Sequence, residues 1–343
     1  MPQYYAHSTP NSDKSDWQPL EAHLLAVADL AEEFAQAFNA GKWGRCTGLL
    51  HDAGKACADF IARLEGKANR VDHITFGARR ALELHKAWGT LLAYVISGHH
   101  GGLPDGGVQE KQLGYRLKHG KVAEETQILP GLECAVGLSF PFQLEKKTAT
   151  FSLAFFTRML FSCLVDADFL DTEKFCNQKK AAHRTGMSCS TATELNALLH
   201  SFLTEKQQKA KPGKVNGIRQ DVLRQCLDKA QKPQGFYTLT VPTGGGKPLS
   251  SLAFALKHAE THGLARVIYT IPFTSIIEQN AQVFRDALGE NNVLEHHSNY
   301  HEQAETAEYD KWRSLASENW DAPVVVTTNV QFFESLSLLS HRY

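Results

Sequence analysis

Hydrophobic positions recur every three or four residues through the first half of the chain. From Leu20 to Leu170 they form stripes at the i, i+3, i+4 spacing of amphipathic helices. The clearest stripes cover residues 20–31, 44–53, 74–85, 88–97 and 151–170. Between them lie stretches rich in Gly, Pro and charge, the longest near residues 101–148. The pattern predicts an all-α domain with one loop-rich insertion.

The next stretch, residues 177–235, has a different composition. Its Lys and Arg residues cluster at Lys206, Lys209, Lys211, Lys214, Arg219, Arg224, Lys229 and Lys232. The turn sequence Lys211-Pro-Gly-Lys divides it, so we expect a connector of two helices. Its basic face is either solvated or a phosphate-binding surface, and the sequence leaves both readings open.

After Gly235 short apolar runs alternate with helical stretches. The runs at residues 236–241, 266–271 and 323–328 are predicted strands, and predicted helices cover residues 250–262 and 275–288. This alternation is typical of βαβ units with a parallel sheet. We therefore expect an α plus α/β protein, with an all-α domain at residues 1–176, a basic helical connector at 177–235 and an α/β domain at 236–343.

The composition of the chain indicates where the protein is located in the cell, but says little about the reaction it catalyses. The 343 residues carry a net charge of −1, so the whole chain gives no electrostatic sign of a nucleic-acid partner. The polar N-terminus has no signal-peptide pattern, and no apolar run approaches the roughly 18 residues that would span a membrane. Seven cysteines without a C-x-x-C pair argue against a disulfide framework and against structural zinc. We expect a cytoplasmic protein with reduced thiols and no membrane association.

Histidines and aspartates on the apolar helices form the strongest chemical pattern. His51 and Asp52 end one such helix, with Lys55 one turn later, and a second adjacent pair, His99-His100, ends another. A carboxylate on an apolar helix is costly unless it is paired or bound to a metal. The candidate metal ligands are His23, His51, Asp52, His73, His99, His100 and Asp168. Asp166 is a rival to Asp168 for the last position.

Imidazole and carboxylate ligands together suit transition metals such as Mn, Fe, Co, Ni or Zn. Two such ions about 3.5–4 Å apart can hold both the attacking and the leaving oxygen of a phosphodiester. Asp52 is the natural bridging ligand, and Lys55 could stabilise charge on the phosphoryl group. The catalytic candidates are therefore His51, Asp52 and Lys55. A second histidine group, His296, His297 and His301, has no carboxylate suited to complete a metal site.

A glycine-rich loop near residue 244 predicts a phosphate-binding site. It follows a predicted strand and precedes a predicted helix, which is the context such a loop requires. Glycines let backbone N–H groups face a phosphate, and the helix N-terminus favours its negative charge. The nucleotide-binding candidates are Thr243, Gly244, Gly245, Gly246 and Lys247. Pro248 stands where the Mg²⁺-binding hydroxyl of such loops is expected. The fold should tolerate proline there, but magnesium binding should suffer.

The order of these motifs resembles a known family. Residues 20–172 look like the HD superfamily of metal-dependent phosphohydrolases, and His23, His51-Asp52, Lys55, His73, His99-His100-Gly101 and Asp168 match the HD nuclease domain of the CRISPR-associated nuclease-helicases of type I systems. The glycine loop, Ile271-Pro-Phe-Thr-Ser and Thr327-Thr-Asn-Val-Gln resemble superfamily 2 helicase motifs of the same family.

The resemblance implies a metal-dependent single-stranded DNA endonuclease of antiviral defence, using Mn, Fe, Co or Ni. It further implies recruitment by the Cascade surveillance complex, and ATP with Mg for a RecA-like helicase half. No acidic Walker B motif precedes Tyr343. We therefore expect a truncated helicase without DNA-stimulated ATPase activity. Two alternatives remain open: an HD phosphohydrolase acting on nucleotides or cyclic nucleotides, and a DNA- or ATP-binding protein whose metal is structural.

Overall fold

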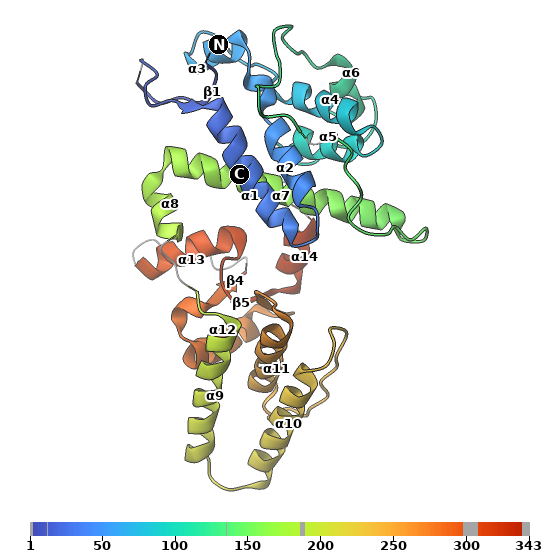
Figure 1. The fold of residues 1–343 in the computed structure, drawn as a ribbon. Coiled ribbons are helices and arrows are strands. Elements are labelled where there is room, and N and C mark those ends of the chain that lie inside the picture. Colours follow the sequence, from blue (N-terminus) through green and yellow to red (C-terminus); the bar gives the residue numbers. More distant parts are fainter. Residues whose placement is uncertain (1–2, 12, 135, 186–188, 298–307, 338–343) are drawn as a thin grey trace. The chain divides into compact units, whose positions relative to one another are not determined.

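The computed structural model describes the chain except residues 1–2, 12, 135, 186–188, 298–307 and 338–343 (Figure 1). It divides into two compact units, the first running to Ala181 and the second from Ala182 to Leu336. The helix α8 (Gln178–Thr185) contains this boundary. None of the helices in the described part of the chain is long and apolar enough to cross a bilayer.

The first unit is almost entirely helical. Its elements are the strands β1 (Tyr5–His7) and β2 (Gln18–Pro19), the helices α1 (Leu20–Gln36), α2 (Gly41–Leu50), α3 (Ala58–Leu64), α4 (Ile74–His85), α5 (Gly89–Gly98), α6 (Leu113–His119) and α7 (Ala149–Cys176), and the short 3-10 helix η1 (Ala53–Lys55). The prediction of an all-α domain is confirmed, with α6 inside the predicted insertion and one small antiparallel strand pair beside α1.

The core of this unit lies where α1, α2, α5 and α7 meet. Buried apolar side chains from all four helices, such as Val27, Leu50, Leu92 and Leu160, form one cluster. Two glycines allow backbones to approach closely: a Cβ on Gly48 of α2 would lie 2.4 Å from the Cα of Ala28 on α1, and one on Gly77 of α4 would lie 1.9 Å from the Leu50 carbonyl oxygen. The helix ends that carry the candidate ligands are therefore tightly packed.

The cysteine prediction fails at one pair. Cys46 on α2 and Cys134, in the segment between α6 and α7, are joined by a disulfide whose Cα atoms lie 5.3 Å apart. The partners are separated by 88 positions in the sequence. Spacing along the chain could not reveal a contact that only the fold creates.

The second unit contains the parallel sheet. Its elements are α9 (Ala192–Lys209), α10 (Lys214–Ala230), α11 (Lys247–His262), β3 (Val267–Ile271), α12 (Thr274–Leu288), η2 (Glu290–Asn292), β4 (Val293–His296), α13 (Glu308–Asn319), β5 (Val324–Thr328) and α14 (Asn329–Ser337). The strand order is β3-β5-β4, and both pairings are parallel.

Helices cover both faces of this sheet. On the central strand β5, Val324 and Val326 pack into a cluster with α9, α11 and α12, whereas Val325 packs with Leu294 and Ala316 on the other face. Side chains that alternate between two buried faces explain the continuous apolar run of β5. The small parallel sheet predicted from strand–helix alternation is thus present.

Two details of this half differ from prediction. Residues 236–241 form no strand, and Phe236, Tyr237 and Leu239 are exposed. An apolar run becomes a strand only when a neighbouring strand pairs with it, and none does so here. The residues assigned to a separate connector also pack into the α/β unit, since Leu195 and Leu199 of α9 belong to its core. Their basic side chains are exposed, which is compatible with both readings of that face.

Candidate metal centre

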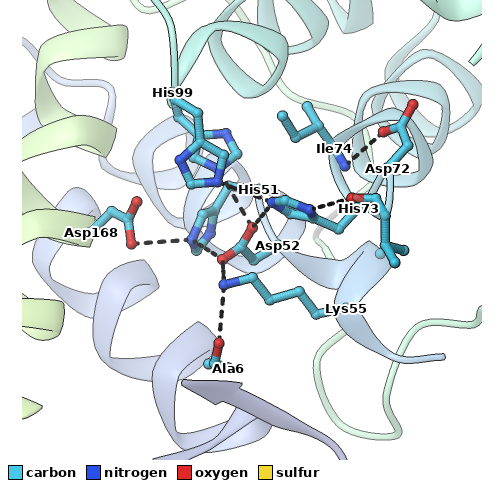
Figure 2. A network of polar contacts seen from close by, with 12 residues as sticks. Ala6, His51, Asp52, Lys55, Asp72, His73, Ile74, His99 and Asp168 are labelled. Atoms are coloured by element: carbon cyan, nitrogen blue, oxygen red, sulfur yellow. Dashed lines mark hydrogen bonds and ion pairs between the residues drawn. The ribbon is translucent and has the colours of Figure 1, made fainter. Parts of the chain in front are cut away.

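His51 and Asp52 lie where α2 ends. His51 caps the helix, and the chain turns at Asp52 into η1, so the two side chains leave the helix axis toward the same space. Both are fully enclosed, with exposed fractions of 0% and 1%. From η1, the Lys55 ammonium lies 2.6 Å from Asp52 Oδ2 and donates to the Ala6 carbonyl oxygen (Figure 2).

One group of candidate ligands gathers around Asp52 Oδ2. His51 Nε2 lies 3.4 Å from this oxygen, and His23 Nε2 of α1 lies 3.6 Å from it. Asp168 of α7 faces the same two rings, with its Oδ1 3.5 Å from His23 Nε2 and 3.6 Å from His51 Nε2. Two ligand atoms that each bind a tetrahedral ion at about 2.1 Å lie about 3.4 Å apart, so these four residues match one ion.

A second group gathers around the other oxygen of Asp52. His73 Nε2 lies 3.6 Å from Asp52 Oδ1, and His99 Nε2 lies 3.5 Å from it. His100 completes the group, with its Nε2 3.0 Å from His73 Nε2. Asp52 therefore belongs to two four-residue groups and presents a different oxygen to each.

Contacts made by Nδ1, the ring nitrogen that points away from Asp52, fix the orientation of four of the histidine rings. The Nδ1 atoms of His51, His73 and His99 lie 2.8, 3.1 and 2.7 Å from the carbonyl oxygens of Gly48, Val71 and Ile96. His23 Nδ1 lies 2.6 Å from Asp171 Oδ2. When Nδ1 carries the proton and donates it, Nε2 is left with a lone pair, which is the tautomer that binds a metal.

The Nε2 atoms themselves are orphaned. Those of His23, His51 and His99 are buried without a hydrogen-bond partner in the described structure, and so is Asp52 Oδ1. An unsatisfied buried polar atom costs about 1–3 kcal/mol, and here four of them lie in one cluster of side chains. Divalent cations bound in the two groups would satisfy all four, so the residues present fit a metal centre.

The ionisation of the site is also unusual. Burial alone would raise the pKa of Asp52, but Lys55 and His51 beside it hold that pKa well below its ordinary value. Burial likewise opposes a charge on His23, yet its hydrogen bond to Asp171 and the nearby Asp52 carboxylate raise its pKa to about 9. The pKa of His99 is raised as well, because Asp52 outweighs the effect of burial. An ion that binds at neutral pH would therefore displace a proton from His23.

Sequence reasoning missed a supporting group. Asp171 lies one turn after Asp168 on α7 and contacts His23, while Gln18 Nε2 donates to the same carboxylate oxygen at 2.7 Å. His7 is also near, its ring centroid 5.1 Å from that of His23, and burial lowers its pKa to about 4. The i, i+3 spacing of Asp168 and Asp171 on one helix was the available sign.

The other candidates are placed as follows. Asp168 lies within the cluster, and Asp166 is not part of any group that could hold a metal among the described residues. His301 lies outside the described residues. His297 does have a carboxylate near it, contrary to expectation, because its Nε2 lies 3.0 Å from Glu295 Oε1. Arg285 already binds the other oxygen of Glu295 at 2.6 Å.

The glycine loop stands apart, in the second unit. Gly244 and Gly246 adopt positive φ, and Lys247 begins α11, so the loop-to-helix part of the predicted phosphate site is present. The predicted preceding strand is absent. Pro248 lies in the first turn of α11, where its missing N–H costs no helical hydrogen bond. Arg219 of α10 donates to the Gly244 carbonyl oxygen at 2.9 Å.

Comparison with known proteins agrees with this geometry. Residues 20–129 match the HD domain family. Over these residues the chain is similar to an HD domain. The chain is also 30% identical, over 160 residues, to the CRISPR-associated nuclease/helicase Cas3 of Haloferax volcanii. This match covers 37% of the present chain and 17% of the Haloferax protein.

Solved structures extend the likeness beyond the HD domain. T. fusca Cas3 bound to ADP superposes with a TM-score of 0.56 at 14% identity, over 96% of this chain and 43% of that one. T. fusca Cas3 without a named nucleotide gives 0.54 at 14% identity, over 96% and 44%. The chain therefore spans less than half the length of these relatives. At such identity the likeness concerns the fold, and with the sequence match it confirms the resemblance to CRISPR-associated Cas3 proteins.

Proposed function

We propose that the HD domain is a metal-dependent endonuclease that cuts single-stranded DNA in CRISPR antiviral defence. The observation that carries the proposal is the sharing of Asp52 between two four-residue ligand groups, with orphaned imidazole nitrogens on both sides. Two adjacent cations are the arrangement that many phosphodiester-cleaving enzymes use. The relatives named nuclease/helicase support the substrate class.

In this proposal each part of the site has a defined task. His23, His51 and Asp168 would hold one ion, His73, His99 and His100 the other, and Asp52 both. Bound ions of this kind lower the pKa of water and neutralise charge on the phosphoryl oxygens. The carbonyl groups behind His51, His73 and His99 would keep these rings aimed at the ions, and Asp171 would do so for His23. The donor set suits Mn, Fe, Co, Ni and Zn, and we assign the ions to the Mn, Fe, Co and Ni class because of the resemblance to the CRISPR-associated nuclease-helicases.

Lys55 would act beside the ions. Its ammonium lies against Asp52 and is almost fully buried. In a site of low dielectric a fixed positive charge interacts more strongly with a developing anion than it would in water. We propose that Lys55 stabilises negative charge on the phosphoryl group, while also holding Asp52 in place.

The test is a cleavage assay on circular single-stranded DNA with Mn²⁺ or Ni²⁺. We expect the wild-type chain to cut and Asp52→Ala to lose at least about 100-fold in rate, since removing a shared ligand removes several kcal/mol of stabilisation. Asp59→Ala, an exposed carboxylate on α3, is the matched control and should cut normally.

The same assay separates the alternatives. If a panel of nucleotides and cyclic nucleotides is hydrolysed while DNA stays intact, the site belongs to a nucleotide phosphohydrolase. If neither is hydrolysed and Asp52→Ala only lowers the melting temperature, the metal is structural. Either result refutes the nuclease proposal.

For the second unit we propose a RecA-like nucleotide-binding role with weak magnesium dependence. Lys247 and the positive-φ glycines would contact the phosphates of ATP, as in the helicase half of the relatives, but Pro248 offers no hydroxyl to Mg²⁺. We expect no DNA-stimulated ATP turnover from the wild type, and a gain in Mg-dependent ATP affinity in Pro248→Thr. DNA-dependent turnover by the wild type would contradict this.

For the partner we propose a Cascade-type surveillance complex that presents the displaced DNA strand. The support is the likeness to Cas3 proteins alone. Co-sedimentation of the chain with such a complex on target DNA would test it, and cleavage confined to complex-bound DNA would agree with it.

A further inference from the structure

A second group of metal-binding side chains lies in the first unit, outside the HD centre. Cys46 of α2, Cys134 of the segment before α7 and His85 at the end of α4 converge so that their ligand atoms all lie within 4.8 Å of one another. All three residues are buried. Neither the nuclease chemistry nor the phosphate loop uses any of them.

His85 is not explained by other contacts. Its Nε2 lies 3.3 Å from Cys46 Sγ, and its Nδ1 has no hydrogen-bond partner in the described structure. The ring is only 6% exposed. A buried imidazole that contacts one cysteine sulfur, and has a second cysteine sulfur nearby, is placed as a ligand would be.

We propose that, when the Cys46–Cys134 disulfide is reduced, Cys46, Cys134 and His85 bind one thiophilic divalent cation of the zinc class. Reduction by a dithiol transfers two electrons and two protons to the disulfide and leaves the dithiol oxidised. The ion then displaces one proton from each thiol, forms two metal–sulfur bonds and takes the lone pair of His85 Nε2. The site would thus exchange a covalent link for a coordinated one.

The charge balance favours this site. Two thiolates and one neutral imidazole around a divalent cation carry no net charge, so no unpaired charge is buried. Sulfur and nitrogen ligands together are the set that zinc prefers, and three protein ligands occur in zinc sites that keep a further position. The Cα atoms of the two cysteines, 5.3 Å apart, already place both side chains within reach of one ion.

The fold also indicates where the site lies relative to the surface and which elements a bound ion would connect. Glu133 and Val136, close to Cys134 in the sequence, are exposed, so the segment that carries Cys134 lies at the surface of the unit. The ion would tie that segment to α2 and α4. His51 follows the last residue of α2 and His73 precedes the first residue of α4, so the bound ion would steady two elements of the nuclease centre.

The test uses Co²⁺ as a probe on the full chain, reduced with a dithiol under anaerobic conditions and then freed of the reductant. A sulfur-to-cobalt charge-transfer band distinguishes this site from the HD centre, because the HD ligands contain no sulfur, and the cysteine variants below assign the band to particular thiols. We expect the band to rise to one equivalent of Co²⁺ in the wild type and to persist in Asp52→Ala. It should disappear in Cys134→Ser and in wild type reoxidised to the disulfide.

Cys163→Ser is the matched control, a buried cysteine of α7 outside the cluster, and should keep the band. His85→Ala should weaken Co²⁺ binding at least about tenfold, as loss of one ligand of three. Absence of the band in reduced wild type would overturn the proposal, even if Cys134→Ser failed to fold. A band that survives in folded Cys134→Ser but is lost in Cys163→Ser would overturn it too. Neither outcome bears on DNA cleavage by the HD centre.

Discussion

A substitution of Asp171 tests how the residues behind the ligands set the metal affinity of the HD centre. Its carboxylate accepts a hydrogen bond from His23 Nδ1 at 2.6 Å and is the main group that raises the pKa of that ring. Asp171→Asn keeps the size of the side chain and removes its charge. A hydrogen bond to a charged group contributes about 1.5–3 kcal/mol. That range corresponds to about 10- to 100-fold in metal affinity, in line with other outer contacts of metal ligands.

The pH dependence gives the prediction its direction. In the metal-free wild type His23 stays protonated up to its pKa of about 9, so below that pH an ion must displace this proton, and the apparent affinity rises as pH rises. Asp171→Asn lowers the pKa of His23 and thereby removes part of this competition near pH 7. The affinity lost in the variant should therefore be larger at pH 9 than at pH 7.

Calorimetric titration with Mn²⁺ under anaerobic conditions, at both pH values, measures this difference. We expect one of the two binding steps to weaken about 10- to 100-fold at pH 9, and less at pH 7. Asp29→Asn removes the carboxylate of an exposed ion pair with Arg45 and should change neither step. Equal affinity of Asp171→Asn and wild type at pH 9 would refute the reasoning.

Two further predictions concern packing and ligand assignment. Gly48→Ala places a Cβ against Ala28 and should destabilise the first unit by about 1–3 kcal/mol, which a lower melting temperature would show. Gly101→Ala is the control, because no atom lies within 4 Å of the added Cβ, and its melting temperature should equal that of the wild type. Equal melting temperatures of the two variants would count against the close approach of α1 and α2. Asp168→Asn should lose one equivalent of bound metal by elemental analysis and Asp166→Asn none, and the reverse result would make Asp166 the ligand.

The sequence predicted well those features that depend on local pattern. The helix over residues 74–85 was found at its observed bounds, because Asp72 accepts hydrogen bonds from the Ile74 and Thr75 amides and so fixes where α4 begins. The histidine and aspartate pairs stood out because they interrupt apolar helices. Their mutual arrangement around Asp52 stayed a prediction until the fold placed them.

Features that depend on distant partners were not predicted. The apolar run at residues 236–241 lacks a pairing strand, and Cys46 meets Cys134 only through tertiary structure. The strand β4 was missed because half of its four residues, Glu295 and His296, are polar yet buried. Arg285 on α12 neutralises Glu295 at 2.6 Å, a compensation that no pattern in the sequence shows.

The position of Asp52 between two ligand groups links the occupancy of one to that of the other. In the proposed centre, an ion on the His23 side would fix the plane of the Asp52 carboxylate and so orient its second oxygen, but it would also withdraw charge from that oxygen. By thermodynamic reciprocity, whatever the first ion does to the affinity of the second, the second does to the first. A substitution at His73 should therefore also change the metal affinity of the group that contains His51, and the two groups would bind their ions cooperatively, with either sign.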